Sequence, residues 1–296
     1  MIKPFPKIFA IGARYIPDIF EGEVEITEKI DGSQFVFGKV NGVLHMRSKG
    51  AIVYKDAPEK LFAEAVNYIV SIEGRLPDNT IFYCEYLKKP KHNVLAYDRT
   101  PKNHLILFGI SSADDYFNDD LEKWATALEI ESVPVLYKGS IGSAEKLLEL
   151  LAITSVLGGQ KIEGVVVKNY KKTVLVGGQV MPIMAGKYVS EQFKEVHQRD
   201  WGKENTGKGK FEVYAEQFNS AARWNKAVQH LKEKGKLESA PQDIGILMAE
   251  IKNDIMLEEK ENIKEWLWQT FSREIMAKAI NGFPEWYKKQ LLEGSF

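Results

Sequence analysis

Five short segments of the chain place lysine, arginine or glutamate where strands are expected to end. These segments are residues 28–32, 47–50, 82–86, 163–168 and 185–188. A lysine amine is a nucleophile once it has lost its proton, and carboxylates bind hard metal ions. Each segment alone is typical of a strand with a charged residue at its exposed end. That account does not explain all five in this order, so we interpret them together as one active site.

The hydrophobic pattern predicts the elements that carry these segments. Residues 24–30 alternate apolar and acidic side chains, as a half-buried strand does. Asn41-Gly42 is a strong two-residue hairpin turn between strands expected at residues 34–40 and 43–47. Further strands are predicted at residues 80–87, 104–110, 162–168 and 183–189, and helices at residues 61–70, 121–128 and 144–153. Strands that come as hairpins, with helices between them, indicate an α+β fold with a largely antiparallel sheet.

The character of the sequence changes after about residue 198. Residues 200–210 are polar and rich in glycine, which predicts a linker. Beyond them, apolar residues recur at helical spacing around residues 221–231, 244–255 and 263–275, and almost no strand signal remains. We therefore predict two domains, an α+β domain over residues 1–198 and a small all-helical domain over residues 199–296.

The composition excludes several kinds of protein. Cys84 is the only cysteine, so an intrachain disulfide and a cysteine-based zinc site are impossible. With 40 basic and 41 acidic residues, the chain cannot hold nucleic acid by bulk charge, and phosphates would have to meet local basic clusters. No segment is apolar over the length of a membrane span, and Pro4 and Pro6 interrupt the N-terminal apolar run, unlike a signal peptide. We expect a soluble, cytoplasmic protein, in the host cytoplasm if the source is a phage.

The five segments resemble, in order and in spacing, nucleotidyltransferase motifs I, Ia, III, IV and V of the covalent ligase and capping-enzyme superfamily. The resemblance covers about residues 24–190. EKIDGSQF at residues 28–35 is most similar to the phage RNA ligase 2 family and to the RNA-editing ligases, and LFGI at residues 107–110 resembles the aromatic motif of that family. The helical C-terminal third also resembles that family, whereas DNA ligases and capping enzymes continue with an OB-fold of short strands. The resemblance implies an ATP-dependent RNA ligase with an adenylyltransferase core.

The resemblance implies three catalytic lysines, Lys29, Lys168 and Lys187. Lys29 would carry AMP on its side-chain amine. Because a free lysine has a pKa of about 10.4, we expect desolvation and the two neighbouring cations to lower the pKa of Lys29. Lys168 and Lys187 would also neutralise the oxygens of the phosphorus under attack.

The resemblance also implies a set of nucleotide-binding residues: Glu28, Ile30, Gln34, Arg47, Glu85, Phe108, Glu163 and Val166. Phe108 and Val166 would enclose the adenine, while Glu28 and the backbone of Ile30 would read the base edge and select ATP over GTP. Arg47 would hold the ribose or phosphate, with Gln34 and Asp31 near the ribose and the strand end. Glu85 and Glu163 would contact the ribose and bind Mg²⁺ or Mn²⁺.

The implied reaction is three nucleotidyl transfers. ATP adenylylates Lys29, the AMP passes to a 5′-phosphate, and a 3′-OH attacks the activated end and releases AMP. The expected partner is RNA with 3′-OH and 5′-phosphate ends, including nicked duplexes, bound by a monomer whose helical domain engages the nucleic acid. No membrane partner is expected.

One departure from the motifs leaves alternatives open. Motif V commonly has two lysines separated by one residue, and here the first position is Ala185. The later transfers could therefore be altered. A DNA ligase or a capping-type guanylyltransferase is a second interpretation. A non-catalytic RNA end-binding protein that keeps the fold is a third, although retention of Lys29 and the other catalytic residues argues against it.

Three further signals carry less weight. Residues 202–208 match the skeleton of a P-loop, but Gly209 replaces its serine or threonine and no strand precedes it, so we reject that interpretation. The lysine runs at residues 88–91 and 171–172 flank the predicted site and fit either solvated loops or contacts with a phosphate backbone. Helical spacing predicts that Trp224 and Trp266 pack in a core.

Overall fold

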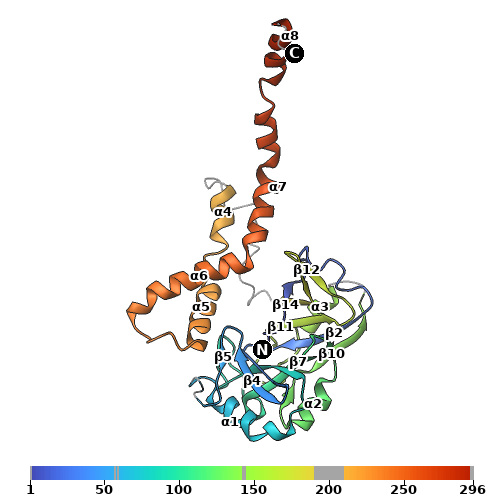
Figure 1. The fold of residues 1–296 in the computed structure, drawn as a ribbon, viewed down its shortest axis with the longest axis vertical. Coiled ribbons are helices and arrows are strands. Elements are labelled where there is room, and N and C mark those ends of the chain that lie inside the picture. Colours follow the sequence, from blue (N-terminus) through green and yellow to red (C-terminus); the bar gives the residue numbers. More distant parts are fainter. Residues whose placement is uncertain (1, 57, 59, 142–144, 190–209, 294–296) are drawn as a thin grey trace. The chain divides into compact units, whose positions relative to one another are not determined.

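The computed structural model describes residues 2–56, 58, 60–141, 145–189 and 210–293 (Figure 1). It divides into two compact units, Met1–Ser239 and Ala240–Phe296. The first unit holds two large β-sheets, and the second is helical wherever it is described. The α+β class with antiparallel sheets and a helical C-terminal region is therefore confirmed. The predicted domain boundary at residues 198–199 falls inside the first compact unit and stays a prediction.

A five-stranded sheet carries three of the five predicted motif segments. Its strands, in spatial order, are β1 (Phe9–Ala10), β14 (Met184–Val189), β11 (Gly164–Asn169), β2 (Glu23–Lys29) and β10 (Val135–Ser140). β1 runs parallel to β14, and the other neighbours are antiparallel. A two-stranded ribbon of β12 (Val174–Val176) and β13 (Gln179–Met181) connects β11 to β14. Residues of motifs I, IV and V are thus brought onto adjacent strands.

A second sheet carries the other two segments. Its strands are, in spatial order, β5 (Ile52–Val53), β4 (Val43–Ser48), β3 (Ser33–Val40), β6 (Thr80–Tyr86), β7 (Leu105–Ser112) and β8 (Phe117–Asn118), with β9 (Glu131–Ser132) also paired to β7. The hairpin between β3 and β4 turns at Asn41-Gly42, whose φ angles are 53° and 75°. Both angles are those of a type I′ turn, so this prediction is confirmed.

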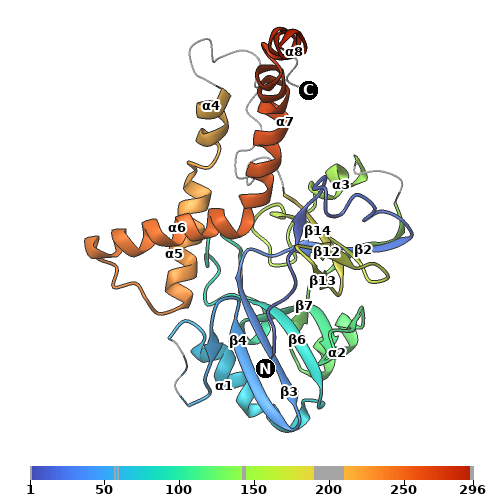
Figure 2. The same cartoon turned by 45° about the horizontal axis from the view of Figure 1, so that its top comes forward.

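Helices cover one face of the second sheet. They are α1 (Ala63–Ser71) with the 3₁₀ turn η1 (Glu73–Arg75), and α2 (Leu121–Ala127), while η2 (Lys102–His104) precedes β7 and α3 (Glu145–Leu150) lies between β10 and β11. Phe35 packs on Phe62 at the start of α1, and Phe82 packs on Trp124 of α2, both at 5.5 Å between ring centroids. Figure 2 shows β3, β4 and β6 side by side with α1 and α2 next to them. Gln34, Arg47 and Glu85 lie on the opposite face of this sheet.

The part of the chain after residue 210 is helical, as predicted. Its elements are α4 (Lys210–Glu216), α5 (Ala221–Glu233), η3 (Pro241–Asp243), α6 (Ile244–Glu258), α7 (Lys260–Ala279) and α8 (Phe283–Leu292). None of the described helices combines the length and the apolar character needed to cross a membrane. The predicted linker lies outside the described residues except for Lys210, which begins α4, and the P-loop-like residues 202–208 lie outside them entirely.

Some predictions from the sequence are wrong or incomplete. Trp224 is 49% exposed on α5, so it does not pack in a core, while Trp266 is half-buried. The sequence also gave no signal for β10, a half-exposed edge strand that contains Gly139 at φ 139°. A strand of this kind lacks the regular alternation on which the prediction depends.

Candidate active site

The register of the five-stranded sheet brings the predicted catalytic lysines onto one face. Residues opposite each other in an antiparallel pair share a face, and alternate residues along a strand do too. Lys29 of β2 lies opposite the first residue of β11. Val166 and Lys168 of β11 lie opposite Lys187 and Ala185 of β14. Residues from segments far apart in the sequence therefore lie on one face of the sheet, namely Lys29, Val166, Lys168, Ala185 and Lys187.

Glu28 lies on the other face of β2. The adjacent residue Ile26 and its neighbours Val165 and Val167 fill a hydrophobic core on that face. The Glu28 carboxylate accepts a hydrogen bond from the backbone N–H of Val156 (3.0 Å). Burial raises the pKa of Glu28, although its hydrogen bonds with Ser155 and Val156 oppose this. Glu28 therefore points away from Lys29, and its role at the base edge stays a prediction.

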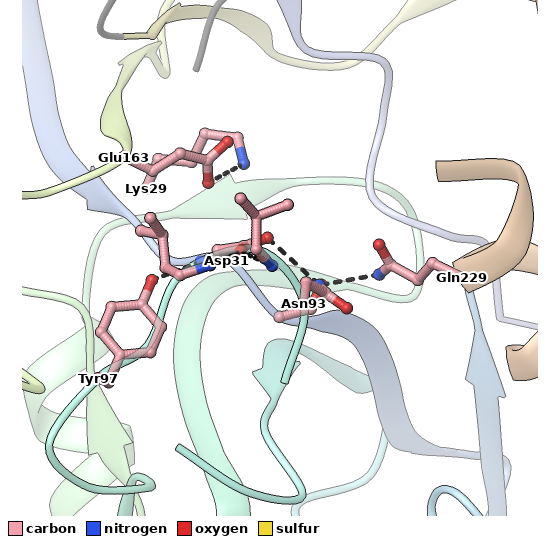
Figure 3. A network of polar contacts seen from close by, with 9 residues as sticks. Lys29, Asp31, Asn93, Tyr97, Glu163 and Gln229 are labelled. Atoms are coloured by element: carbon pink, nitrogen blue, oxygen red, sulfur yellow. Dashed lines mark hydrogen bonds and ion pairs between the residues drawn. The ribbon is translucent and has the colours of Figure 1, made fainter. Parts of the chain in front are cut away.

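Lys29 is paired with a carboxylate at the end of β2. Its Nζ lies 2.7 Å from Oε2 of Glu163, and the two side chains are 26% and 15% exposed (Figure 3). Burial lowers the pKa of Lys29, but the charges of Glu163, Glu85 and Asp31 raise it further, so the net pKa lies above its ordinary value. The expectation that the site lowers this pKa is wrong, because the charged groups that act on Lys29 are acids and not cations.

Lys168 is paired as well, but deep inside the protein. Its Nζ lies 3.1 Å from Oε1 of Glu25, and the side chains are 1% and 2% exposed. The Tyr170 hydroxyl donates a second hydrogen bond to the same oxygen (2.8 Å). Burial lowers the pKa of Lys168, while Glu25 opposes that shift. Lys168 is thus a neutralised, buried cation, and Glu25 is a site residue that we did not predict, although the acidic alternation of residues 24–30 contains it.

Motif V contributes one half-buried lysine and one buried alanine. Lys187 lies on β14 beside Val166, whereas Ala185 is fully buried opposite Lys168. The position where the resemblance expects a lysine therefore adjoins the Lys168–Glu25 pair. A second lysine here would stand next to Lys168 with no water to screen the two charges.

Glu85 and Gln34 come from the second sheet, where they lie opposite each other on β6 and β3. Oε2 of Glu85 is buried and has no hydrogen-bond partner among the described residues. Burial raises the pKa of Glu85 to about 8, and the charge of Lys29 opposes the shift while those of Glu233, Glu163 and Asp31 add to it. The charges of Glu85 and Lys29 therefore affect each other, and the role of Glu85 in the site stays a prediction.

The N-terminal segment contacts three of the predicted nucleotide-binding residues. The backbone N–H of Phe5 donates to the Gln34 side chain (3.1 Å), and Nη1 of Arg47 donates to the carbonyl of Ile2 (3.1 Å). The Phe5 ring packs edge-on against Phe108 at 5.1 Å. Phe108 is only 9% exposed. The sequence did not indicate these contacts, because residues 2–5 carry no periodic pattern.

The turn after Lys29 is held by the loop that follows β6. The side chain of Ile30 is buried in the hydrophobic core that also contains Phe35 and Phe82. The Asp31 backbone N–H donates to the Tyr97 hydroxyl, and Oδ2 of Asp31 accepts from the N–H groups of Val94 and Leu95, each at 2.8 Å (Figure 3). The Asp31 carboxylate therefore organises this loop beside the site.

Comparison with known proteins decides the family. The profile described as RNA ligase matches residues 22–189, the stretch that contains every predicted site residue. This chain belongs to the RNA ligase family. The comparison of this family member with curated proteins finds no match.

Solved structures of the Naegleria gruberi RNA ligase have a similar fold. The complex with PPi has a TM-score of 0.51 at 19% identity and covers 66% of this chain and 58% of that one. An apo aspartate-to-alanine mutant has a TM-score of 0.50 at 19% identity, covering 66% and 57%. A lysine-to-alanine mutant with ATP and Mn has a TM-score of 0.50 at 17% identity, covering 65% and 58%. The chain thus spans less than two thirds of the length of these RNA ligase chains, and the likeness concerns the fold.

The residues present fit the divalent cation predicted for this RNA ligase family member. A buried carboxylate oxygen without a partner, such as Oε2 of Glu85, is costly unless a cation or a donor compensates it. Carboxylate oxygens are what Mg²⁺ prefers, and it commonly binds one or two of them together with substrate phosphates and water. Within the described ranges, no cluster of three or more His, Cys, Asp or Glu side chains could hold a metal by itself. Glu85 and Glu163 would therefore share the ion with a nucleotide.

Proposed function

We propose that this chain is an ATP-dependent RNA ligase that joins 3′-OH and 5′-phosphate ends through AMP bound to Lys29. The observation that carries the proposal is the shared sheet face of Lys29, Val166 and Lys187, with Glu163 2.7 Å from the Lys29 amine. It supplies a nucleophile, an apolar surface and a second cation in one place. The fold likeness to a ligase crystallised with ATP and Mn supports the same nucleotide and a divalent cation.

In the first transfer the Lys29 amine attacks the α-phosphorus of ATP. A nitrogen–phosphorus bond forms, the bond to pyrophosphate breaks, and pyrophosphate leaves opposite the amine. Lys29 must first lose a proton, and Glu163, its hydrogen-bond partner, is the nearest acceptor. Lys187 and Lys168 would stabilise the charge on the phosphate oxygens. A divalent cation at Glu85 and Glu163 would neutralise two carboxylates that raise the pKa of Lys29.

In the second transfer the role of Lys29 is reversed, from nucleophile to leaving group. A 5′-phosphate oxygen of the RNA attacks the AMP phosphorus, and Lys29 leaves and regains a proton. A protonated amine is the better leaving group, so a proton must reach the Lys29 nitrogen as its bond to phosphorus breaks. A 3′-OH then attacks the 5′-phosphate of the adenylylated end, and AMP leaves.

The remaining predicted residues would bind the nucleotide. Phe108 and Val166 come from different sheets, and both are apolar and nearly buried, as two walls of an adenine pocket would be. Glu28 and the backbone of Ile30 would read the base edge. The Glu28 side chain lies on the opposite face of β2 from Val166, and its buried Oε1 has no partner among the described residues. Gln34 and Arg47 would contact the ribose and phosphates from the facing sheet.

The helical residues 199–296 would engage the RNA, and residues 1–198 would form the adenylyltransferase domain. We propose a cytoplasmic monomer acting on RNA ends, including nicks. Because the first compact unit runs to Ser239, the informative truncation removes Ala240–Phe296. Formation of the AMP adduct should stay within about twofold, while strand joining falls at least about tenfold through lost phosphate contacts. A truncated chain that seals nicks as well as the full chain would contradict this division of roles.

Intact-mass spectrometry with and without Mg-ATP tests the central claim. We expect one AMP added to the full chain, mapped by peptide sequencing to Lys29, and no addition with GTP. Addition of GMP instead would indicate a capping-type enzyme. A strong preference for a 3′-deoxyribose nick would indicate a DNA ligase, and absence of any adduct would favour an RNA end-binding protein.

A further inference from the structure

Helix α5 presents two polar side chains to the turn that follows Lys29. Ser220 caps this helix by accepting a hydrogen bond from the backbone N–H of Arg223 (3.3 Å). Gln229 and Glu233, one helical turn apart, lie on the same face and are joined by a hydrogen bond of 2.9 Å. Glu233 is only 4% exposed, so this face of α5 is packed against the rest of the first unit and not against solvent.

Gln229 donates directly to the turn. Its side-chain nitrogen lies 3.0 Å from the carbonyl oxygen of Gly32 and 3.3 Å from Oγ of Ser33 (Figure 3). The Gly32 carbonyl can only accept, which fixes the Gln229 nitrogen, and not its oxygen, toward the turn. Asn93 donates to the same carbonyl at 2.9 Å. Both lone pairs of this oxygen are thus used, one by the loop after β6 and one by α5.

The turn has no room to shift toward β6. A Cβ atom on Gly32 would lie 2.9 Å from the carbonyl oxygen of Tyr86 and 3.1 Å from Oε2 of Glu85. Gly32 therefore sits directly against the predicted cation ligand, with Lys29 three residues before it in the chain. Any displacement of the turn alters the position of Lys29 relative to Glu85.

Helix α5 also contacts the second predicted turn of the site. A Cβ atom on Gly50, which ends the motif Ia segment, would lie 2.6 Å from Nε2 of His230. Consecutive residues of α5 thus reach the turn after Lys29 and the turn after Arg47. The helix spans the two segments that the nucleotide would join.

We propose that Gln229 is a positioning residue for adenylylation, and that α5 holds the turn after Lys29 in place for attack on ATP. The inference rests on the proposed function. Gln229 itself would not contact ATP. It acts through the Gly32 carbonyl, and so it should affect the rate of attack more than the binding of ATP.

A purely structural role for Gln229 makes a different prediction. If α5 only stabilises the fold, loss of the hydrogen bond should slow all three transfers together and lower the melting temperature. If Gln229 positions Lys29, only steps in which the Lys29 amine attacks should slow. Sealing of RNA whose 5′ end already carries AMP needs no attack by Lys29, and it separates the two roles.

The test compares Gln229→Met with Gln269→Met in the full chain. Methionine has a side chain of similar length, which preserves packing, but it has no hydrogen to donate. Gln269 of α7 makes an equivalent hydrogen bond to Glu265 one turn away (2.9 Å) but is exposed, so its variant controls for loss of an in-helix pair. Gln229→Ala serves if the methionine variant does not fold.

Single-turnover rates of AMP-adduct formation and of sealing of pre-adenylylated RNA give the outcome. We expect Gln229→Met to slow adduct formation about tenfold at saturating ATP with an unchanged KM, since misplacing a reacting group is costly. Sealing should stay within about twofold, and Gln269→Met should match the wild-type chain. Equal loss in both steps, or loss in neither, would overturn the inference. A wild-type chain that forms no adduct would instead overturn the proposed function, and the inference with it.

Discussion

Two lysine–glutamate pairs lie at opposite ends of the same strand pair and differ in their access to solvent. Lys29 at the end of β2 pairs with Glu163 just before β11, and Lys168 near the end of β11 pairs with Glu25 of β2. Each strand thus supplies one lysine, and each lysine meets an acid near the other strand. The first pair is 26% and 15% exposed, and the second is 1% and 2% exposed.

This difference fits the roles proposed above, with Lys29 as the reactive lysine and Lys168 as a fixed charge. A lysine that attacks a substrate and later leaves must be reachable and able to change its partner, as Lys29 is. The Lys168 ammonium is closed off and shares its acid with the Tyr170 hydroxyl. The acids near Lys29 raise its pKa, whereas burial lowers the pKa of Lys168. Position on a shared sheet face therefore does not give two lysines the same chemistry.

The largest expected effect is on covalent chemistry. Lys29→Ala should abolish the AMP adduct in Mg-ATP, because no other described lysine on this face combines exposure with a strand-end position. Lys168→Met should slow adduct formation about 100-fold through lost charge stabilisation and still yield the adduct at long times. Intact-mass time courses measure both. An adduct on Lys29→Ala, or none at all on Lys168→Met when it is folded, would break the comparison.

The second prediction concerns stability, for which Lys168→Met should have a larger effect than Lys29→Ala, the reverse of the order for adduct formation. Lys168→Met leaves Glu25 buried without its cation, which should lower the free energy of unfolding by about 3–5 kcal/mol. Lys29→Ala leaves Glu163 near solvent and should cost far less. Lys171→Met is the matched control, because this lysine pairs with Glu23 at 3.6 Å but its side chain is 79% exposed. The free energy of unfolding of this variant should stay within about 0.5 kcal/mol of the wild-type value. Urea unfolding midpoints give the ranking, and equal midpoints for Lys168→Met and Lys171→Met would contradict it.

The smallest expected effect is a shift in the pH dependence of the rate of adduct formation. Glu25 opposes the lowering of the Lys168 pKa by burial, and Asp119 adds a weaker effect of the same sign. Glu25→Gln should therefore lower the pKa of Lys168 further, so that Lys168 loses its proton at a lower pH. If Lys168 acts as a cation, the alkaline fall in the rate of adduct formation should move to lower pH.

The control for this shift is Glu23→Gln, an exposed acid two residues earlier on β2. Its pH–rate profile should superimpose on that of the wild-type chain. An unmoved alkaline limb in Glu25→Gln, together with reduced stability, would mean that the buried pair only supports the fold.

Local signals allowed much of the core to be predicted from the sequence. The Asn41-Gly42 turn and the strand at residues 24–30 depend on neighbours along the chain, and both were predicted correctly. The expectation that this strand is half-buried is wrong, because residues 24–28 are buried on both faces. Lys29 and Lys168 look alike in the sequence, each a lysine near the end of a predicted strand. Their different burial depends on Glu25 and Tyr170, which reach Lys168 only through strand pairing. Gln229 lies about 200 residues from the turn that it contacts, and no local pattern reports such a contact.

The N-terminal segment limits how far the two sheets can separate. Phe5 is fixed to Gln34 in one sheet, and Phe9 is paired with Gly186 in the other. The four residue steps between them span at most about 14 Å when fully extended. Gln34 and Gly186 can therefore move apart only as far as this stretched segment allows while both contacts are kept. A wider separation of the two sheets requires either Phe5 or Phe9 to lose its contact.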